Sequence, residues 1–182
     1  NANAAEPEQV HLATTGNSGE MVVQWGTQED TTAFCNSDNI VEYGTDSNSL
    51  NFSETGDDDM YLWTTCTHTT ILSGLEPNTT YYYRVGGSGE WSDIFSFKTL
   101  EAEPESVLIG AIADHGTSSN AQDTTSNMLL NDFDLVIHAG DISYANGAGS
   151  GNGVGDQSVW DEYQNQIEKV ASKSPHMYAP GN

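Results

Sequence analysis

Residues 107–116 decide the fold, and they read VLIGAIADHG. The apolar run at residues 107–113 lacks the polar residue at every second position that a half-buried strand carries. Such a continuous run is typical of a strand that is buried on both faces, as in a parallel sheet. Asp114 and Gly116, which follow it, predict a sharp turn at the carboxyl end of this strand. The stretch therefore predicts an α/β fold from this point onward.

The chain after this stretch alternates helical and strand-like patterns. Helices are expected over residues 121–130 and 160–172, the second because its apolar residues recur at helical spacing. Further strands are expected at residues 135–137 and from residue 177 onward. The resulting β-α-β-α-β order predicts a parallel sheet with right-handed crossovers.

The chain before this stretch has the pattern of an all-β domain. Short runs rich in β-branched and aromatic residues are separated by clusters of Gly, Asn, Asp and Ser, which predicts a β-sandwich. Trp25 is expected in its core. Strands are expected at residues 10–13, 21–25, 40–44, 69–72, 80–85 and 94–97. The predicted organisation is a sandwich at residues 1–100, a linker at 101–105 and the first half of an α/β domain at 106–182.

The charge balance excludes several functions. The chain has 27 acidic and 4 basic residues, and its formal net charge is -23. Nucleic acids and anionic membrane surfaces would be repelled, because binding either of them needs a basic face. No run reaches the ~20 apolar residues of a membrane-spanning helix. The acidity is interpreted as a solvated surface suited to salty water, with Ca²⁺ binding at residues 57–59 as the alternative.

Three features indicate export. Cys35 and Cys66 are expected to form a disulfide, with two buried free thiols as the alternative. Asn51 and Asn78 each begin an N-glycosylation sequon. The N-terminus is polar, as in a mature chain after removal of a signal peptide. We therefore expect a secreted, extracellular glycoprotein.

Polar side chains follow each of the three strands predicted for the α/β part. Asp114 follows the first strand, Asp141 and Tyr144 follow the second, and Asn182 follows the third. The carboxyl ends of parallel strands meet at one edge of a sheet, so these side chains should converge. Their oxygen donors suit Fe³⁺, Mn²⁺ or Mg²⁺, whereas Zn²⁺ or Fe²⁺ would call for histidines as well. Each cluster alone could be a simple turn, but three in this order favour a metal site.

Three motifs resemble the purple acid phosphatase family: HAGDISYA at residues 138–145, WDEY at 160–163 and PGN at 180–182. The α/β part is similar to the calcineurin-like metallophosphoesterase domain of that family. The sandwich, with its leucine and tyrosine corner at residues 72–83, resembles the fibronectin III-like domain of the plant- and fungal-type members.

The resemblance implies a role for each candidate ligand. Asp114 would bind a ferric ion, and Tyr144 would bind the same ion through its phenolate. Asp141 would bridge the two metals. Asn182 would bind the second metal, which is Zn²⁺, Mn²⁺ or Fe²⁺.

The family pattern also requires histidines that these 182 residues lack. It places one directly after Asn182 and three more further on, so we expect the chain to continue past Asn182 and this stretch alone to be inactive. Both crossover helices should cover one face of the sheet, which leaves the other face bare and open to self-association. His138 is expected to pack or to form a hydrogen bond. His115 occupies the variable position of the first motif, and its approach to the site is left open.

These features favour a secreted acid phosphatase that hydrolyses phosphate monoesters by a two-metal mechanism. One alternative is an extracellular structural or adhesive protein that uses a phosphatase-like scaffold, because fold alone does not establish activity. Another is a Ca²⁺-binding matrix module. Metal at the four ligands would favour the first reading, and extensive contacts between copies would favour the second.

We predict that Asn78 carries glycan more often than Asn51. The sequon of Asn78 lies in a turn before a strand, whereas residues 51–53 have the composition of a strand. Glycopeptide mass spectrometry of native material measures the occupancy of both sites. Two unmodified asparagines would contradict the prediction.

Overall fold

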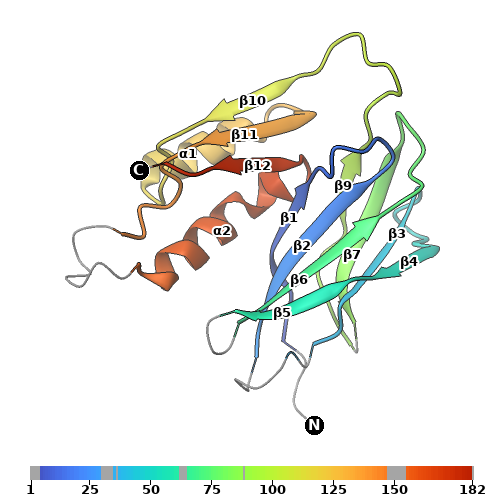
Figure 1. The fold of residues 1–182 in the computed structure, drawn as a ribbon, viewed down its shortest axis with the longest axis horizontal. Helices are drawn as coiled ribbons and strands as arrows, with labels where there is room; N and C mark the ends of the chain where they lie inside the picture. Colours follow the sequence, from blue (N-terminus) through green and yellow to red (C-terminus); the bar gives the residue numbers. More distant parts are fainter. Residues whose placement is uncertain are drawn as a thin grey trace.

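A computed structural model describes residues 5–29, 35, 37–61, 65–87, 89–146 and 155–181. Two antiparallel sheets come first along the chain, and a three-stranded parallel sheet with two helices follows them (Figure 1). This is the predicted fold: a β-sandwich followed by a β-α-β-α-β unit.

The sandwich consists of a four-stranded and a five-stranded sheet. The first has the order β1-β2-β6-β5 and contains β1 (Glu8–Ala13), β2 (Met21–Gln28), β5 (Asp57–Tyr61) and β6 (Thr65–Leu72). The second has the order β4-β3-β7-β8, with β9 also paired to β7. Its strands are β3 (Ile40–Gly44), β4 (Phe52–Thr55), β7 (Thr80–Gly87), β8 (Glu90–Trp91) and β9 (Phe95–Lys98).

Alternating residues of both sheets form one apolar core between them. Trp25 is buried there, as predicted, and its ring stacks on that of His68 with centroids 5.0 Å apart. The corner before β7 is also as expected, because Leu75 is buried and the hydroxyl of Tyr81 accepts the N–H of Glu76 at 3.0 Å. The core further contains Val10, Leu12, Met21, Val23, Val41, Tyr43, Leu72, Tyr83, Val85 and Phe97.

The acidic run at residues 57–59 lies in β5, where the sequence analysis predicted no strand. Asp57, Asp58 and Asp59 pair with Thr69, His68 and Thr67 of β6. Successive side chains of a strand point to opposite faces, so the three carboxylates do not converge on one point. The structure therefore gives no support to a Ca²⁺ loop at this run. β8 was likewise absent from the predicted strands, whereas β4 agrees with the strand composition of residues 51–53.

A disulfide joins Cys35 to Cys66 of β6, as expected. The two Cα atoms are 5.7 Å apart, and the cysteines are separated by 31 positions in the chain. Cross-linking a loop of this length stabilises a fold by roughly 3–4 kcal/mol in the chain-entropy model.

The parallel sheet has the order β10-β11-β12, with strands β10 (Ile109–Ile112), β11 (Leu135–Ala139) and β12 (His176–Ala179). Its crossovers contain α1 (Ser119–Met128) and α2 (Gln157–Ala171). None of the helices in the described part of the chain is long and apolar enough to cross a membrane.

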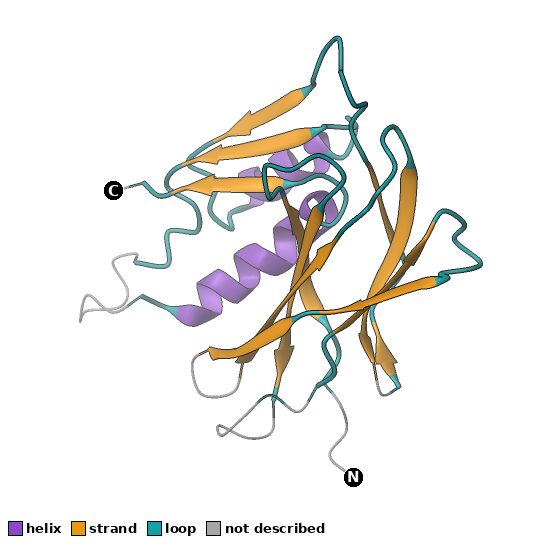
Figure 2. Ribbon diagram, turned by 45° about the vertical axis from the view of Figure 1, so that its right-hand side comes forward, coloured by secondary structure: helices purple, strands orange, loops and turns teal. Residues whose placement is uncertain are grey.

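Both helices pack against the same face of the parallel sheet (Figure 2). Val136 and His138 of β11 point toward the helices and are buried. Ile109 and Ile137 point the other way and are 49% and 38% exposed. The bare second face that the sequence analysis anticipated is therefore present in this chain.

Helix α2 also packs against the sandwich, along the free edge of β1 (Figure 1). The carboxylate of Glu168 accepts the N–H of Val10 at 3.1 Å, so it satisfies a backbone donor that no neighbouring strand pairs. Burial raises the pKa of Glu168. At the end of the helix, the buried hydroxyl of Tyr83 donates to the carbonyl of Ser172 at 2.6 Å. These bonds attach α2 to both sheets of the sandwich.

We predict that Tyr83→Phe lowers the free energy of unfolding by about 1–2 kcal/mol, because it leaves the buried Ser172 carbonyl without its donor. Tyr82→Phe is the matched control, since Tyr82 neighbours Tyr83 on β7 and is only partly buried. Urea denaturation of both variants measures the difference. Equal midpoints for the two variants would contradict the assigned role of this bond.

Candidate metal centre

Three of the four predicted ligands lie in the turns that follow β10 and β11. Asp114, Asp141 and Tyr144 all have positive φ angles, of 51°, 49° and 57°. This left-handed conformation is uncommon for residues other than glycine, and such strain gathers at functional sites. Asn182 lies outside the described residues.

Backbone hydrogen bonds join the two turns to each other. The N–H groups of Asp114, His115 and Gly116 donate to the carbonyls of Gly140, Asp141 and Ile142 at 3.3, 3.2 and 2.8 Å. These bonds continue the pairing of β10 with β11 beyond the strand ends. They fix the positions of the two aspartates relative to each other.

The hydroxyl of Tyr144 lies beside both carboxylates. It donates to Oδ1 of Asp114 at 2.7 Å. This bond, together with the nearby charges of Asp114 and Asp141, raises the pKa of Tyr144 to about 12. The tyrosine side chain is 47% exposed, so it is open to solvent. The structure thus brings two carboxylates and one phenol together at the carboxyl edge of the sheet.

A third turn, after β12, packs tightly against the second. A Cβ atom on Gly181 would overlap the carboxylate and the backbone nitrogen of Asp141. A Cβ atom on Gly140 would lie 3.0 Å from Cα of Gly181. Only residues without a side chain permit this approach, which sets the orientation of Asp141.

The two motif histidines point away from these ligands, toward the helices. His138 is fully buried, and its Nδ1 lies 2.9 Å from the hydroxyl of Tyr163 in α2. Burial lowers its pKa to about 4, with a smaller contribution from His115. His115 is buried against Thr125 and Gln166. The packing role expected for His138 is confirmed, and His115 does not approach the ligands.

The donor set fits part of a two-metal centre. Two carboxylates and a phenol are the hard oxygen ligands that a ferric ion prefers. No group of three or more His, Cys, Asp and Glu side chains that could hold a metal occurs among the residues that the structure describes. The described chain therefore contributes oxygen ligands and no histidine to this site.

A cleft of about 430 Å³ opens beside these residues, lined in part by Asp141, Tyr144, Gly181 and Trp160 of α2. Trp160 was not among the residues predicted for the site. Thr125 and Gln166, which contact the first turn from the helices, were not predicted either. Gln166 follows Tyr163 by three positions, so a polar residue on the apolar face of α2 was the available signal.

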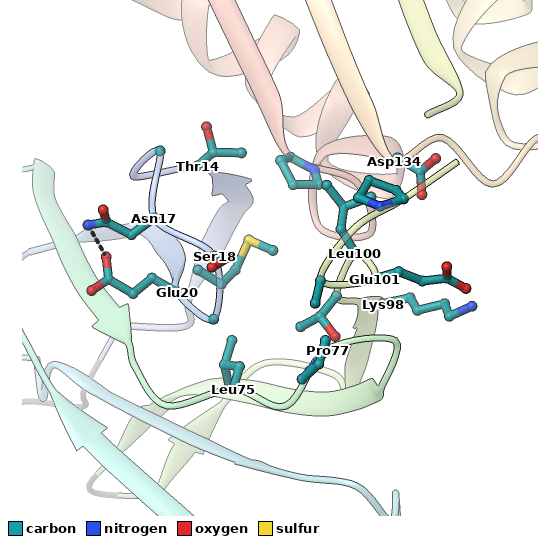
Figure 3. Close-up of a pocket in the computed structure, with 17 residues that line it drawn as sticks. Thr14, Asn17, Ser18, Glu20, Leu75, Pro77, Lys98, Leu100, Glu101 and Asp134 are labelled. Atoms are coloured by element: carbon teal, nitrogen blue, oxygen red, sulfur yellow. Dashed lines mark hydrogen bonds between the residues drawn. The ribbon is translucent and has the colours of Figure 1, made fainter. Parts of the chain in front are cut away.

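A second cavity, of about 490 Å³, lies at the opposite edge of the sheet (Figure 3). Its lining includes Leu75, Leu100, Asp134 and Pro175. Asp134 and Pro175 directly precede β11 and β12, so this cavity is at the amino ends of the strands. Sites in open α/β sheets form at the carboxyl ends, and we assign no catalytic role to it.

We predict that Gly181→Ala lowers the metal affinity of the protein by at least about 10-fold, because the new Cβ displaces the Asp141 carboxylate. Gly155→Ala is the matched control, since its Cβ would meet open space. Metal analysis after dialysis against a weak chelator measures both variants. Wild-type metal content in Gly181→Ala would show that the contact does not fix the ligand.

Comparison with known proteins places the chain in a family. The family model for the purple acid phosphatase N-terminal domain matches residues 7–99. Purple acid phosphatase 22 of Arabidopsis thaliana is 31% identical over 98% of this chain and 38% of its own length. Acid phosphatase type 7 of Danio rerio is 27% identical over 97% of this chain and 40% of its own length.

A solved structure resembles the whole arrangement. The purple acid phosphatase from yellow lupin (Lupinus luteus) seeds superimposes with a TM-score of 0.80 at 25% sequence identity, over 98% of this chain and 35% of that one. The chain thus spans well under half the length of the relatives it matches. With the family model covering residues 7–99 and both sheets and the parallel unit in the same arrangement, the chain belongs to the purple acid phosphatase family.

Proposed function

We propose that this chain is part of a secreted acid phosphatase that hydrolyses phosphate monoesters with two metal ions. One observation carries the proposal: the hydroxyl of Tyr144 lies 2.7 Å from Asp114, and its pKa also responds to Asp141. Turns that served only to reverse the chain would have no reason to bring two carboxylates and a phenol to one point.

Each ligand has a proposed role in this site. Asp114 and Tyr144 would hold a ferric ion, Asp141 would contribute to holding both ions, and Asn182 would hold a divalent ion, which would be Zn²⁺, Mn²⁺ or Fe²⁺. When bound, the ions supply a deprotonated water as nucleophile and neutralise charge on the phosphate.

The electrostatics of the chain support the need for cations at this point. The hydrogen bond that Tyr144 donates to Asp114 raises the pKa of Tyr144, and the charges of Asp114 and Asp141 raise it further, because a third negative charge beside two carboxylates is unfavourable. The same carboxylates would repel a phosphate dianion. A cation at this point reverses both effects, since it favours the phenolate and attracts the substrate.

The proposed location is extracellular. The Cys35–Cys66 disulfide supports it, because such bonds persist in oxidising compartments. Asn51 and Asn78 are both exposed, so a glycosylating enzyme could reach either one. The proposed domain boundaries remain residues 1–100, 101–105 and 106–182.

We predict that Asp141→Asn in the full-length protein lowers phosphomonoesterase turnover by more than about 100-fold, because a bridging carboxylate holds both ions. The sandwich should stay folded, since its core lies away from Asp141. Asp123→Asn, on the exposed side of α1, is the matched control. Turnover of a generic phosphomonoester, metal content and circular dichroism are measured for each protein.

Metal removal tests the same proposal from the other side. Chelated wild-type protein should lose turnover and regain it when iron is added together with zinc or manganese. Near-normal turnover and metal content in Asp141→Asn would overturn the site assignment. Turnover that survives complete chelation would overturn the two-metal function.

A further inference from the structure

Side chains of both helices contact the turn that carries Asp114. Gln166 of α2 donates through Nε2 to the carbonyl of Gly116 at 3.3 Å. Thr125 of α1 lies with its hydroxyl 3.2 Å from Nε2 of His115. His115 and Thr125 are both buried, so these bonds form away from solvent.

The His115 ring links the turn to both helices. Its Nδ1 lies 3.1 Å from the carbonyl of Gly116 and 3.4 Å from Nε2 of Gln166, and its Nε2 lies 3.2 Å from the hydroxyl of Thr125. The Thr125 hydroxyl also donates to the carbonyl of Ala121 at 3.1 Å, so Thr125 joins the ring to its own helix. Gln166 donates to the carbonyl of Gly116.

These contacts restrain the backbone next to a candidate ligand. Asp114 directly precedes His115 and has a φ of 51°, which an unrestrained aspartate rarely adopts. The backbone bonds to the second turn act on one side of the loop. The side chains of Thr125 and Gln166 act on the other side, where the helices pack.

We propose that Gln166 and Thr125 are positioning residues that hold Asp114 in the geometry required for metal binding. The inference rests on the proposed function, since it assigns Asp114 to a metal. It adds two residues, on two different helices, to the machinery of that site.

One feature of Gln166 separates this role from simple core packing. Its Oε1 atom is buried and has no hydrogen-bond partner among the described residues. An unpaired buried amide oxygen is unfavourable for stability, and an apolar side chain of similar length would avoid it. Replacing Gln166 by such an apolar side chain should therefore not lower stability, and this expectation distinguishes a positioning role from core packing.

The first test compares Gln166→Met with Gln164→Met in the full-length protein. Methionine keeps the length of the side chain and removes the donor. Gln164 lies on the same helix, where it lines a cavity with His11 and Trp25 of the sandwich. For Gln166→Met we expect iron affinity to fall by about 10–100-fold, the range found when groups that orient a ligand are removed. The visible absorption of a ferric–phenolate pair should weaken or shift, while the melting temperature stays equal to wild type or rises.

A second measurement needs no metal. In the metal-free protein, amide exchange at residues 114–116 should be at least about 10-fold faster in Gln166→Met than in wild type. In the variant, local opening of the turn no longer has to break the hydrogen bond from Gln166. Gln164→Met should exchange at the wild-type rate.

Thr125 provides an independent pair of variants. Thr125→Val removes the hydroxyl that contacts His115 and should lower iron affinity, whereas Thr125→Ser keeps the hydroxyl and should retain the affinity. Thr124→Val is the matched control, because the Thr124 hydroxyl is exposed and bonds only within α1, to Asn120.

The outcomes separate the inference from the function on which it rests. Wild-type iron affinity and absorption in Gln166→Met would overturn the inference. A loss of iron affinity that is accompanied by a matching fall in melting temperature would also overturn it, because it would indicate a structural role only. Failure of Thr125→Ser to retain affinity would also count against it. A wild-type protein that takes up no iron would overturn the proposed function itself, and the inference with it.

Discussion

The parallel pairing of β10 with β11 is the constraint on which the candidate site depends. Its register places Ile112 opposite His138, so the two strands end at the same level. The backbone bonds from Asp114, His115 and Gly116 then extend the pairing into the turns. The main chain therefore fixes two aspartates side by side although they are far apart in sequence. Their short side chains could reach a common metal ion.

Helix α2 connects this site to the sandwich because its faces have different partners. Toward the parallel sheet, Tyr163 bonds His138 and Gln166 bonds Gly116. Toward the sandwich, the carboxylate of Glu168 accepts a backbone N–H of β1, and the carbonyl of Ser172 accepts a hydrogen bond from the hydroxyl of Tyr83. A displacement of α2 would break bonds on both sides at once. The sandwich thus stabilises the helix that contacts the turn carrying Asp114.

Most of the fold followed from local patterns, and the failures have physical causes. The helices begin earlier than predicted because Ser118 and Asp156 act as N-caps, and each side chain accepts a backbone N–H of the first turn. The strand at residues 57–61 was missed because its acidic composition disfavours a strand, and only pairing with β6 compensates. The direction of the His115 side chain depends on packing against two helices, which no local pattern encodes. By contrast, the convergence of Asp114, Asp141 and Tyr144 followed from their places after neighbouring strands of a predicted parallel sheet.

The backbone strain and the electrostatic repulsion at the candidate site both destabilise the metal-free chain. Three non-glycine residues in left-handed conformations and two carboxylates beside a phenol are each unfavourable in the metal-free chain. Backbone pairing, glycine contacts and the bonds from the helices hold them in place despite this. A cation at this point would relieve the electrostatic part, because it offsets the charge of the two carboxylates beside the phenol.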